Sequence, residues 1–181
     1  MKHAALIVFG LLATPATSST CPAAPDHDAA LSTLISKVQN AKTEFEGQQI
    51  SNQMWALWAD APDATAQKML DTGMSQRASY DYTGALEQFD ALVAYCPDYA
   101  EGYNQRAFVN FLTGDYETAL TDLDLALDRS PRHIAAIAGK AMTLIALQRD
   151  AEAQTVLRRA LRLNPWLGER RFLIEPEGQD L

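Results

Sequence analysis

The sequence predicts an all-α protein, a solenoid of antiparallel helix pairs with three 34-residue repeats behind a degenerate N-terminal helical hairpin. The first observation is a spacing of 34 residues from Pro97 to Pro131, and again from Pro131 to Pro165. The second is a set of small residues that recur at fixed places in each repeat. The third is an apolar residue at every third or fourth position within each half-repeat, which is the helical period. Each unit is therefore predicted to be a helix, a short turn and a second helix that ends near a proline.

The first element, residues 1–18, is predicted to be a secretory signal peptide. A short basic start precedes an apolar run at 4–13, and small residues follow it, so that cleavage fits after Ala16 or Ser18. The run is shorter than the roughly 20 residues that a membrane-spanning helix needs. We therefore expect an exported, periplasmic protein whose mature chain has no integral membrane segment. A buried N-terminal helix is the alternative.

Residues 19–27 are expected to form a flexible mature N-terminus that carries Cys21, one of two cysteines in the chain. The other, Cys96, directly precedes Pro97 at the predicted end of a helix. Disulfides persist in exported proteins, so a Cys21–Cys96 bridge would join this segment to the first repeat. Two free thiols are the main alternative. A lipid anchor on Cys21 is disfavoured, because residues 18–20 resemble a bacterial lipobox poorly.

Residues 28–65 are predicted to form a degenerate helical hairpin. One apolar stripe runs from Leu31 to Phe45, Gly47 interrupts it, and a second stripe runs from Ile50 to Trp58. The exposed end of a repeat stack is apolar and needs a cover. We therefore interpret this hairpin as the N-terminal cap of the stack.

Residues 66–165 hold the three repeats, which are divided as 66–99, 100–133 and 134–167. Their turns are predicted at 80–82, 114–116 and 148–150, and the last has lost its glycine. Small side chains at the eighth and twentieth positions would let the two helices of a pair approach closely. These positions hold Gly73, Ala107 and Ala141, and then Ala85, Ala119 and Ala153. Residues 168–181 are expected to be a C-terminal cap and tail.

The repeats resemble the tetratricopeptide repeat (TPR) family, whose period is 34 residues. The resemblance covers residues 66–165 and implies a TPR-type α-solenoid that binds other proteins. The family's usual tyrosine at position eleven is replaced by Gln76, Asn110 and Leu144. Residues 54–58 (MWALW) and 97–107 also resemble segments of small exported alphaproteobacterial TPR proteins. That second resemblance implies a location and no reaction.

The charge of the chain argues against nucleic acid as a partner. Net charge is −8, and acidic residues dominate up to about residue 128. The basic C-terminal part is interpreted as a solvated helix face, with an acidic partner as the alternative. Its arginines are Arg158, Arg159, Arg162, Arg170 and Arg171.

No pattern in the sequence predicts catalysis, a cofactor or a metal site. Outside the predicted signal peptide there are two histidines, His27 and His133, and no phosphate-binding glycine loop or nucleophile motif. The residues of the Asp26–His27–Asp28 stretch are of the types that bind metal ions, but adjacent side chains point apart. The stretch is therefore interpreted as the solvated, acidic start of a helix. His133 is interpreted as a turn residue. We therefore do not expect an enzyme.

A partner-binding groove is predicted along the first helices of the repeats, which line the concave face of such stacks. A second, largely apolar stripe there suits an adaptable peptide-binding groove. Its residues are Leu70, Met74, Arg77, Asn104, Phe108, Phe111, Leu112, Met142 and Ile145.

The occupant of this groove is expected to be an unknown protein or peptide, as for an adapter in envelope assembly or in maturation of exported complexes. Some TPR proteins grip peptide C-termini with a clamp of lysines and asparagines. That specificity is not carried over, because the matching positions hold other residues. They are Leu70, Met74, Gln105, Ala135 and Gly139.

Four alternatives to an external partner remain. The superhelix interior could carry a small apolar ligand or lipid. The protein's own ends could cover the groove, or its residues could simply pack helix to helix. The chain could also be a structural subunit of a homo-oligomer.

Overall fold

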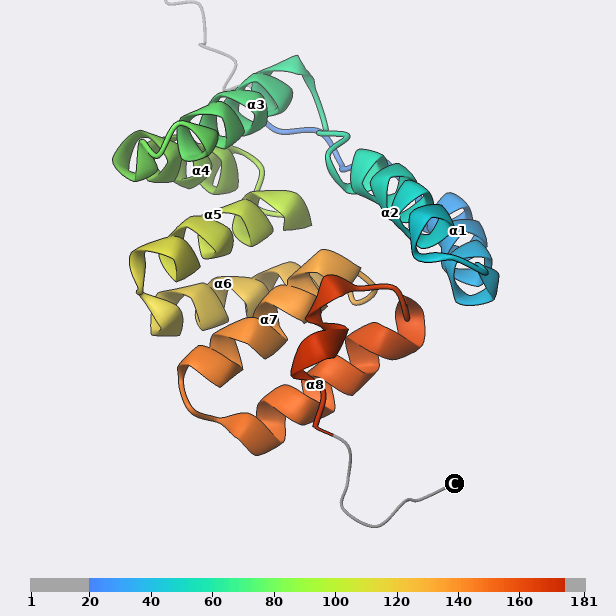
Figure 1. Ribbon diagram of the computed structural model, residues 1–181. Helices are drawn as coiled ribbons and strands as arrows, with labels where there is room; N and C mark the ends of the chain where they lie inside the picture. The colour runs from blue at the N-terminus through green and yellow to red at the C-terminus, as the bar shows by residue number, and fades with distance from the viewer. Residues whose placement is uncertain (1–19, 175–181) are drawn as a thin grey trace, which may run out of the picture.

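The computed structural model describes residues 20–174, so the predicted signal peptide and most of the predicted C-terminal tail lie outside the described residues. The described part is all-α, as predicted, and consists of antiparallel helix pairs (Figure 1). None of its helices is long and apolar enough to cross a membrane. The elements are α1 (Asp28–Asn40), α2 (Glu44–Trp58), α3 (Ala64–Ala78), α4 (Tyr82–Tyr95), α5 (Ala100–Thr113), α6 (Tyr116–Arg129), α7 (Ile134–Ala146), α8 (Asp150–Leu163) and the 3-10 turn η1 (Gly168–Phe172).

Helices α3 to α8 form a stack of three pairs, in which each pair packs against the next (Figure 1). Small residues lie where the helices of a pair meet. Ala107 and Ala119 are buried in one core cluster between α5 and α6. At Gly73, an added Cβ would lie 2.6 Å from Cε1 of Phe89, so only glycine permits this close approach of α3 and α4.

The turn inside each pair uses the same backbone conformation at the same repeat position. Tyr80, Gly114 and Gln148 have φ values of 66°, 85° and 59°. Only the middle one is a glycine, the residue that adopts this left-handed conformation without steric cost. In the first two pairs the next residue, Asp81 or Asp115, caps the second helix by accepting a backbone N–H bond. The loss of the turn glycine from the third repeat therefore leaves its turn intact.

A partly buried ion network ties neighbouring pairs together. Arg106 on α5 makes two bonds to the carboxylate of Asp122 on α6, at 2.9 and 2.7 Å, and one to Asp90 on α4, at 2.8 Å. Asp122 is buried and Asp90 is exposed. Hydrogen bonds from Arg106 to both carboxylates raise the pKa of this arginine, chiefly through Asp122. Such bidentate pairing fixes geometry as well as charge.

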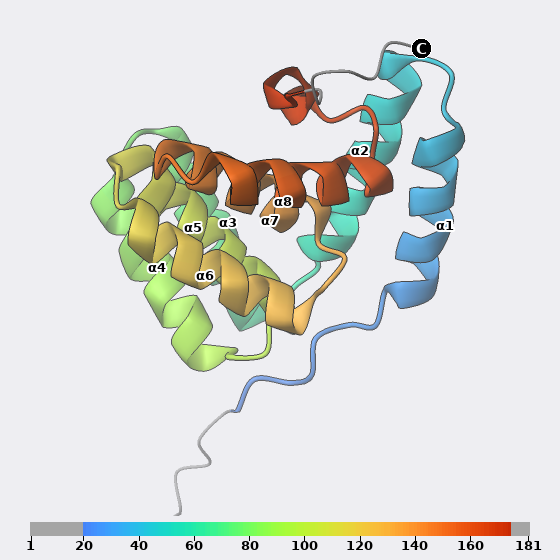
Figure 2. The same ribbon diagram turned by 90° about the horizontal axis from the view of Figure 1, so that it is seen from below.

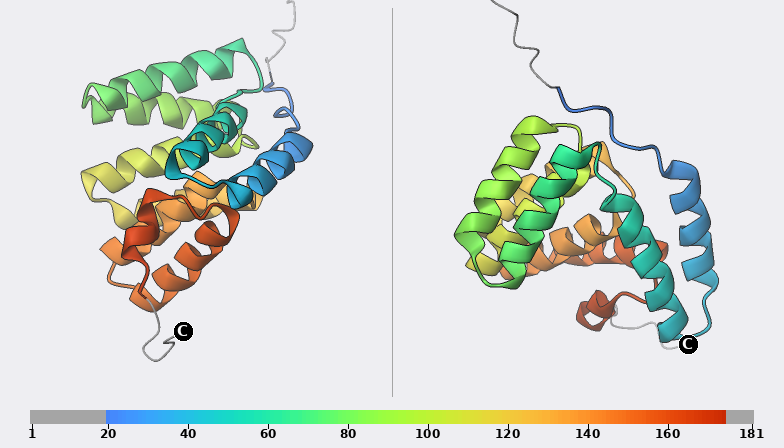
Figure 3. Two further views of the ribbon diagram at one scale, coloured as in Figure 1. Left: turned by 45° about the vertical axis from the view of Figure 1, so that its right-hand side comes forward. Right: turned by 90° about the horizontal axis from the view of Figure 1, so that it is seen from above.

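The α1–α2 hairpin does not cap the first repeat, so that prediction is wrong. It packs instead against the end of the third pair, as Figures 2 and 3 show. Gln39 donates to the Arg162 carbonyl at 2.8 Å, and Asn164 donates to the Ser51 hydroxyl at 2.9 Å. The physical reason is an apolar surface at that end of the stack, against which the apolar stripe of the hairpin packs. This surface consists of Ile134, Leu163, Trp166 and Leu167.

Gly47 does not interrupt the hairpin either; the break lies at residues 41–43, and Gly47 is inside α2. Thr43 starts α2 by accepting a bond from the Glu46 N–H, and the Glu46 carboxylate accepts from the Lys42 N–H. An added Cβ at Gly47 would lie 2.5 Å from Cγ of Trp166. The glycine therefore serves the docking of the hairpin on the C-terminal end of the stack.

Cys21 and Cys96 form a disulfide, with their Cα atoms 5.1 Å apart, and the described residues contain no free cysteine. Residues 20–27 have no regular structure and run from the end of α4 to the start of α1 (Figure 3). His27 bonds Asp60, in the link between α2 and α3, at 2.8 Å. The segment predicted to be flexible is thus joined to the first repeat at Cys21 and to the hairpin link at His27.

Candidate functional site

An open cavity of about 410 Å³, called here the concave pocket, lies against the first helices of the three repeats. Arg77 of α3 and Asn104 of α5 provide polar atoms at its wall. Phe108 and Phe111 of α5, with Met142 of α7, provide apolar surface. These five residues were among those predicted for the groove, and the helical period places them on one face because their positions recur between repeats.

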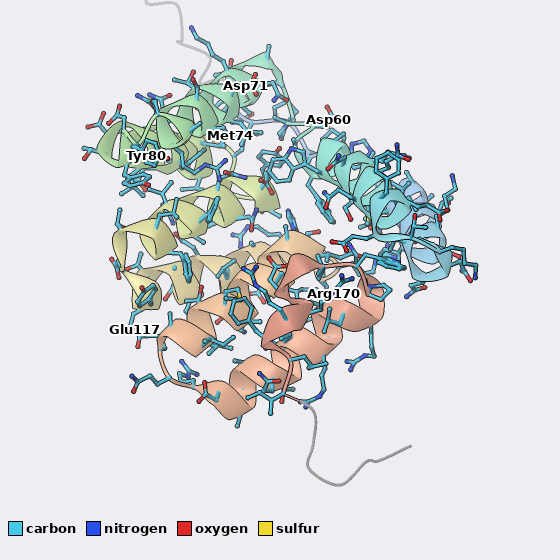
Figure 4. The ribbon with its side chains drawn as sticks, viewed as in Figure 1. Asp60, Asp71, Met74, Tyr80, Glu117 and Arg170 are labelled. Carbon is cyan, nitrogen blue, oxygen red and sulfur yellow. A yellow bond between two sulfur atoms is a disulfide. The ribbon has the colours of Figure 1, made fainter. Side chains whose placement is uncertain are left out.

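Four other predicted residues do not line the concave pocket. Leu70 is wholly buried in a core cluster with Val109 of the next repeat, so its assignment to the groove is wrong. Met74, labelled on α3 in Figure 4, packs against the same cluster. Ile145 packs against a cluster formed by α6 and the third pair. Leu112 is exposed at the last turn of α5, beyond the pocket.

Sequence reasoning missed the opposite wall of the concave pocket. Trp55 of α2 lines it, and so do Leu167 and Glu169 at the C-terminal end. A second cavity, of about 260 Å³, adjoins it and shares Trp55, Ala135 and Leu167. The only sequence signal for this wall was the apolar stripe of the hairpin, which did not say where the hairpin docks. The protein's own ends therefore frame the pocket.

The pocket nevertheless stays open to solvent. Phe108 lines it and is 45% exposed. The Arg77 guanidinium lies over the ring of Phe108, 4.5 Å from its centroid. Burial lowers the pKa of Arg77, and the negative charge of Glu101 opposes that shift. An apolar floor with a half-buried cation at its wall is the main chemical feature of this site.

Gln105 also lines this pocket, and its side chain carries an unpaired polar atom. Its side chain is only 2% exposed, and its Nε2 donates to Oε1 of Glu101. Its Oε1 has no hydrogen-bond partner among the described residues. Buried acceptors are normally paired, so this oxygen requires an explanation.

Glu101 is the centre of a buried network at the junction of the hairpin and the stack. Its carboxylate accepts from Asn104, Gln105 and His133 at 3.0, 2.5 and 2.7 Å. His133 is wholly buried, caps α7 by accepting the Ala136 N–H on Nδ1, and therefore donates from Nε2. The prediction of a simple turn residue at His133 was incomplete, since this side chain holds three elements together.

Trp58, at the end of α2, joins this junction. Its ring stacks on His133, with centroids 4.3 Å apart, and its carbonyl accepts from the Tyr99 hydroxyl at 2.7 Å. Burial raises the pKa of Tyr99, and the nearby Glu101 charge adds to the shift. A cavity of about 160 Å³ beside the junction is lined by His27 and Asp60 among others. No group of side chains in residues 20–174 is arranged to hold a metal ion.

Comparisons with known proteins agree with this architecture. The tetratricopeptide repeat family model matches residues 111–165. A TPR repeat-containing protein from Rhizobium etli is 30% identical over 114 residues, which are 63% of this chain and 56% of the relative. The chain thus spans about half the length of that curated relative.

Solved structures show the same fold. The yeast Sti1 TPR2B domain in its pHsp70 complex has a TM-score of 0.55 at 23% identity, covering 56% of this chain and 81% of that one. The first TPR of Spaghetti (RPAP3), bound to the HSP90 peptide SRMEEVD, has a TM-score of 0.58 at 21% identity, covering 60% and 86%. Residues 111–165 are therefore a tetratricopeptide repeat segment, and the helix pairs around them have the fold of tetratricopeptide repeat domains.

Proposed function

We propose that this protein is an interaction module that binds a segment of a partner protein in the concave pocket, with an apolar side chain of the partner inserted against Phe108 and Met142. The observation that carries the proposal is an open, mainly apolar pocket whose walls come from all three repeats and from the hairpin. Stacked helix pairs use such concave surfaces for binding. The RPAP3 relative in fold holds a peptide, which supports the same use here.

An open pocket favours a peptide over an enclosed small ligand. A carrier surrounds an apolar cargo, because the cargo must be kept from water. Here Phe108 is almost half exposed, and Leu112 extends the apolar surface outward on the same helix. Polar atoms of Arg77 and Glu169 lie at opposite walls of the pocket, on α3 and on the C-terminal turn. Apolar surface with polar flanks suits a segment that continues beyond the pocket.

We further propose that binding takes place in an oxidising compartment, the bacterial periplasm, where the protein acts as an adapter for exported complexes. The Cys21–Cys96 disulfide supports this proposal, since such bonds persist in oxidising environments and are rare in the cytosol. The signal-like composition of residues 1–18 supports it as well.

The binding proposal is tested with an array of short capped peptides. Each carries one central Leu, Phe or Met in a Gly/Ser background, with a single Glu placed at each flanking position in turn. The purified protein and its Phe108→Glu variant are applied, with Phe45→Glu as the matched control. Phe45 is 73% exposed and lies in α2 away from the pocket lining, so its substitution leaves the pocket unchanged.

The proposal predicts that the protein and the Phe45→Glu control bind a common subset of peptides that the Phe108→Glu variant has lost. Anchors of this kind each contribute about 2 kcal/mol or more. Failure of every peptide to bind at about 1 mM would contradict the proposal. Native mass spectrometry that finds an extracted lipid in the purified protein would instead favour a carrier. A mass that rises with concentration in sedimentation would favour self-association.

A further inference from the structure

We propose that Gln105 and Arg77 set the specificity of the concave pocket: it selects an apolar side chain whose own main-chain N–H donates to Gln105 Oε1, with a carboxylate beside it that contacts Arg77. This inference rests on the proposed function and adds the chemistry of the bound segment. Two observations carry the inference: Gln105 Oε1 is buried without a hydrogen-bond partner among the described residues, and the Arg77 guanidinium at the same pocket makes no ion pair there.

Exchanging the oxygen and nitrogen of the Gln105 amide would not remove the unpaired acceptor. Its Nε2 bonds Glu101 Oε1, and a carboxylate can only accept, so the nitrogen must face Glu101. The same carboxylate is fixed by bonds from Asn104 and His133. Gln105 Oε1 is therefore oriented by the junction network, and it is buried without a donor in the described part of the chain.

A peptide N–H fits this oxygen better than other donors. An apolar side chain that enters the pocket covers Phe108 and Ala135, and a donor next to that side chain would pair the acceptor that is already buried. Each peptide residue other than proline carries an N–H next to its own side chain. A single residue can thus fill the apolar floor and satisfy Gln105 together.

Arg77 supplies the second requirement. Its guanidinium is half-buried and contacts the Phe108 ring, but it makes no ion pair in residues 20–174. By contrast, Arg106 of α5 has two carboxylate partners. Glu101 acts on Arg77 only through space. A carboxylate on the bound segment would meet a desolvated, planar cation suited to it.

Glu169 gives this arrangement a direction. It lines the pocket from the C-terminal turn, whereas Arg77 lines it from α3, at the other side of the stack (Figure 1). A carboxylate near Glu169 would be repelled and one near Arg77 attracted. The acidic residue of the segment is therefore expected on one flank of the apolar residue only.

The test is a double-mutant cycle on the tightest peptide of the array, measured by calorimetry. The central residue of this peptide is N-methylated, which deletes the N–H and keeps the side chain. Both forms are titrated into the wild type and the Gln105→Met variant. We expect N-methylation to weaken binding to the wild type about tenfold, and to change binding to the variant by about twofold or less.

The acidic requirement is tested in the same peptide by replacing its Glu with Gln. We expect an affinity loss of about fivefold on the wild type and almost none on Arg77→Met, which keeps the apolar stem over Phe108. Equal losses on wild type and variants would overturn the inference while the proposed function stands. Full binding of the N-methylated peptide by the wild type would overturn it even if Gln105→Met failed to fold. Absence of any binding peptide would overturn both.

Discussion

The repeat stack and the N-terminal hairpin are made of the same kind of helix pair, but they are held in place in different ways. In the stack, each pair contacts its neighbours in sequence, and the Arg106 bonds join residues 16 positions apart. The hairpin instead bonds residues 123 and 113 positions away, through Gln39 and Ser51. A repeated pattern is thus enough to predict the stack. The position of the hairpin depends instead on single, non-repeated contacts at the C-terminal end of the stack.

Removal of the covalent bond between the two regions should destabilise the protein most. The Cys21–Cys96 bond closes a loop of 75 residues. In the chain-entropy account, its removal in a Cys21→Ser, Cys96→Ser variant should lower the free energy of unfolding by about 4 kcal/mol. Urea denaturation with and without reductant measures this loss.

The matched control for the disulfide is the double serine variant itself, which should not respond to reductant. In the wild type, both cysteines should resist alkylation until reduced. Two thiols that alkylate freely in the unreduced protein would contradict the bond.

The next largest effect is expected at the junction where the two regions meet. His133→Ala removes a donor from the buried Glu101, the cap of α7 and the stack on Trp58. We expect a loss of about 3 kcal/mol, because a buried carboxylate loses part of its compensation. His27→Ala is the control, since the His27–Asp60 pair is partly exposed and should contribute less than about 1 kcal/mol. Equal stability of the two variants would remove the junction from the account.

A third variant disturbs the stack alone. Ala119 is wholly buried where α5 and α6 meet, so Ala119→Leu should overpack this crossing at a cost of about 1–3 kcal/mol. The loss should spread along the stack, because repeats stabilise their neighbours. Ala78→Leu, at an exposed position of α3, serves as the control in thermal unfolding. An unchanged midpoint for Ala119→Leu would reject the predicted repeat register.

The smallest effect is expected from a variant that disturbs only the docking of the hairpin. Gly47→Ala would place a Cβ 2.5 Å from Trp166, at a cost of about 1–3 kcal/mol that the better helix propensity of alanine offsets by about 1 kcal/mol. Hydrogen exchange should accelerate in α1 and α2 and stay unchanged in α3 to α6. Gly168→Ala, whose Cβ would meet nothing within 4 Å, is the control. Faster exchange throughout the stack would mean that the two regions are not separable.

The same difference explains what the sequence could predict. The 34-residue spacing and the small residues at Ala107 and Ala119 predict the stack, because the contacts within each helix pair recur in every repeat. Phe108 and Met142 were found in the groove for the same reason, since they hold one repeat position. Leu70 was placed there wrongly, because side chains of the next repeat bury it. The pattern within a single repeat does not show such contacts between repeats.

The opposite wall could not be predicted. Trp55 reaches the pocket only because the hairpin packs against residues more than a hundred positions later in the chain. No periodicity of the sequence encodes that contact. Gly47 looked like a break in the apolar stripe, although its small size serves the packing of Trp166. The unpaired oxygen of Gln105 could not be predicted from the sequence either, since it depends on the junction network of Glu101. Non-repeated contacts of this kind require the structure.

The proposed binding pocket is shared by the two regions, with Phe108 from the stack and Trp55 from the hairpin as facing walls. Calorimetric titration of the array-selected peptide into Phe108→Ala, Trp55→Ala and the control Phe45→Ala tests it directly. We predict that the first two variants each lose about tenfold or more in affinity, and that the control binds like the wild type. Wild-type affinity in Trp55→Ala would show that the hairpin is no part of the site, and wild-type affinity in both pocket variants would contradict the account.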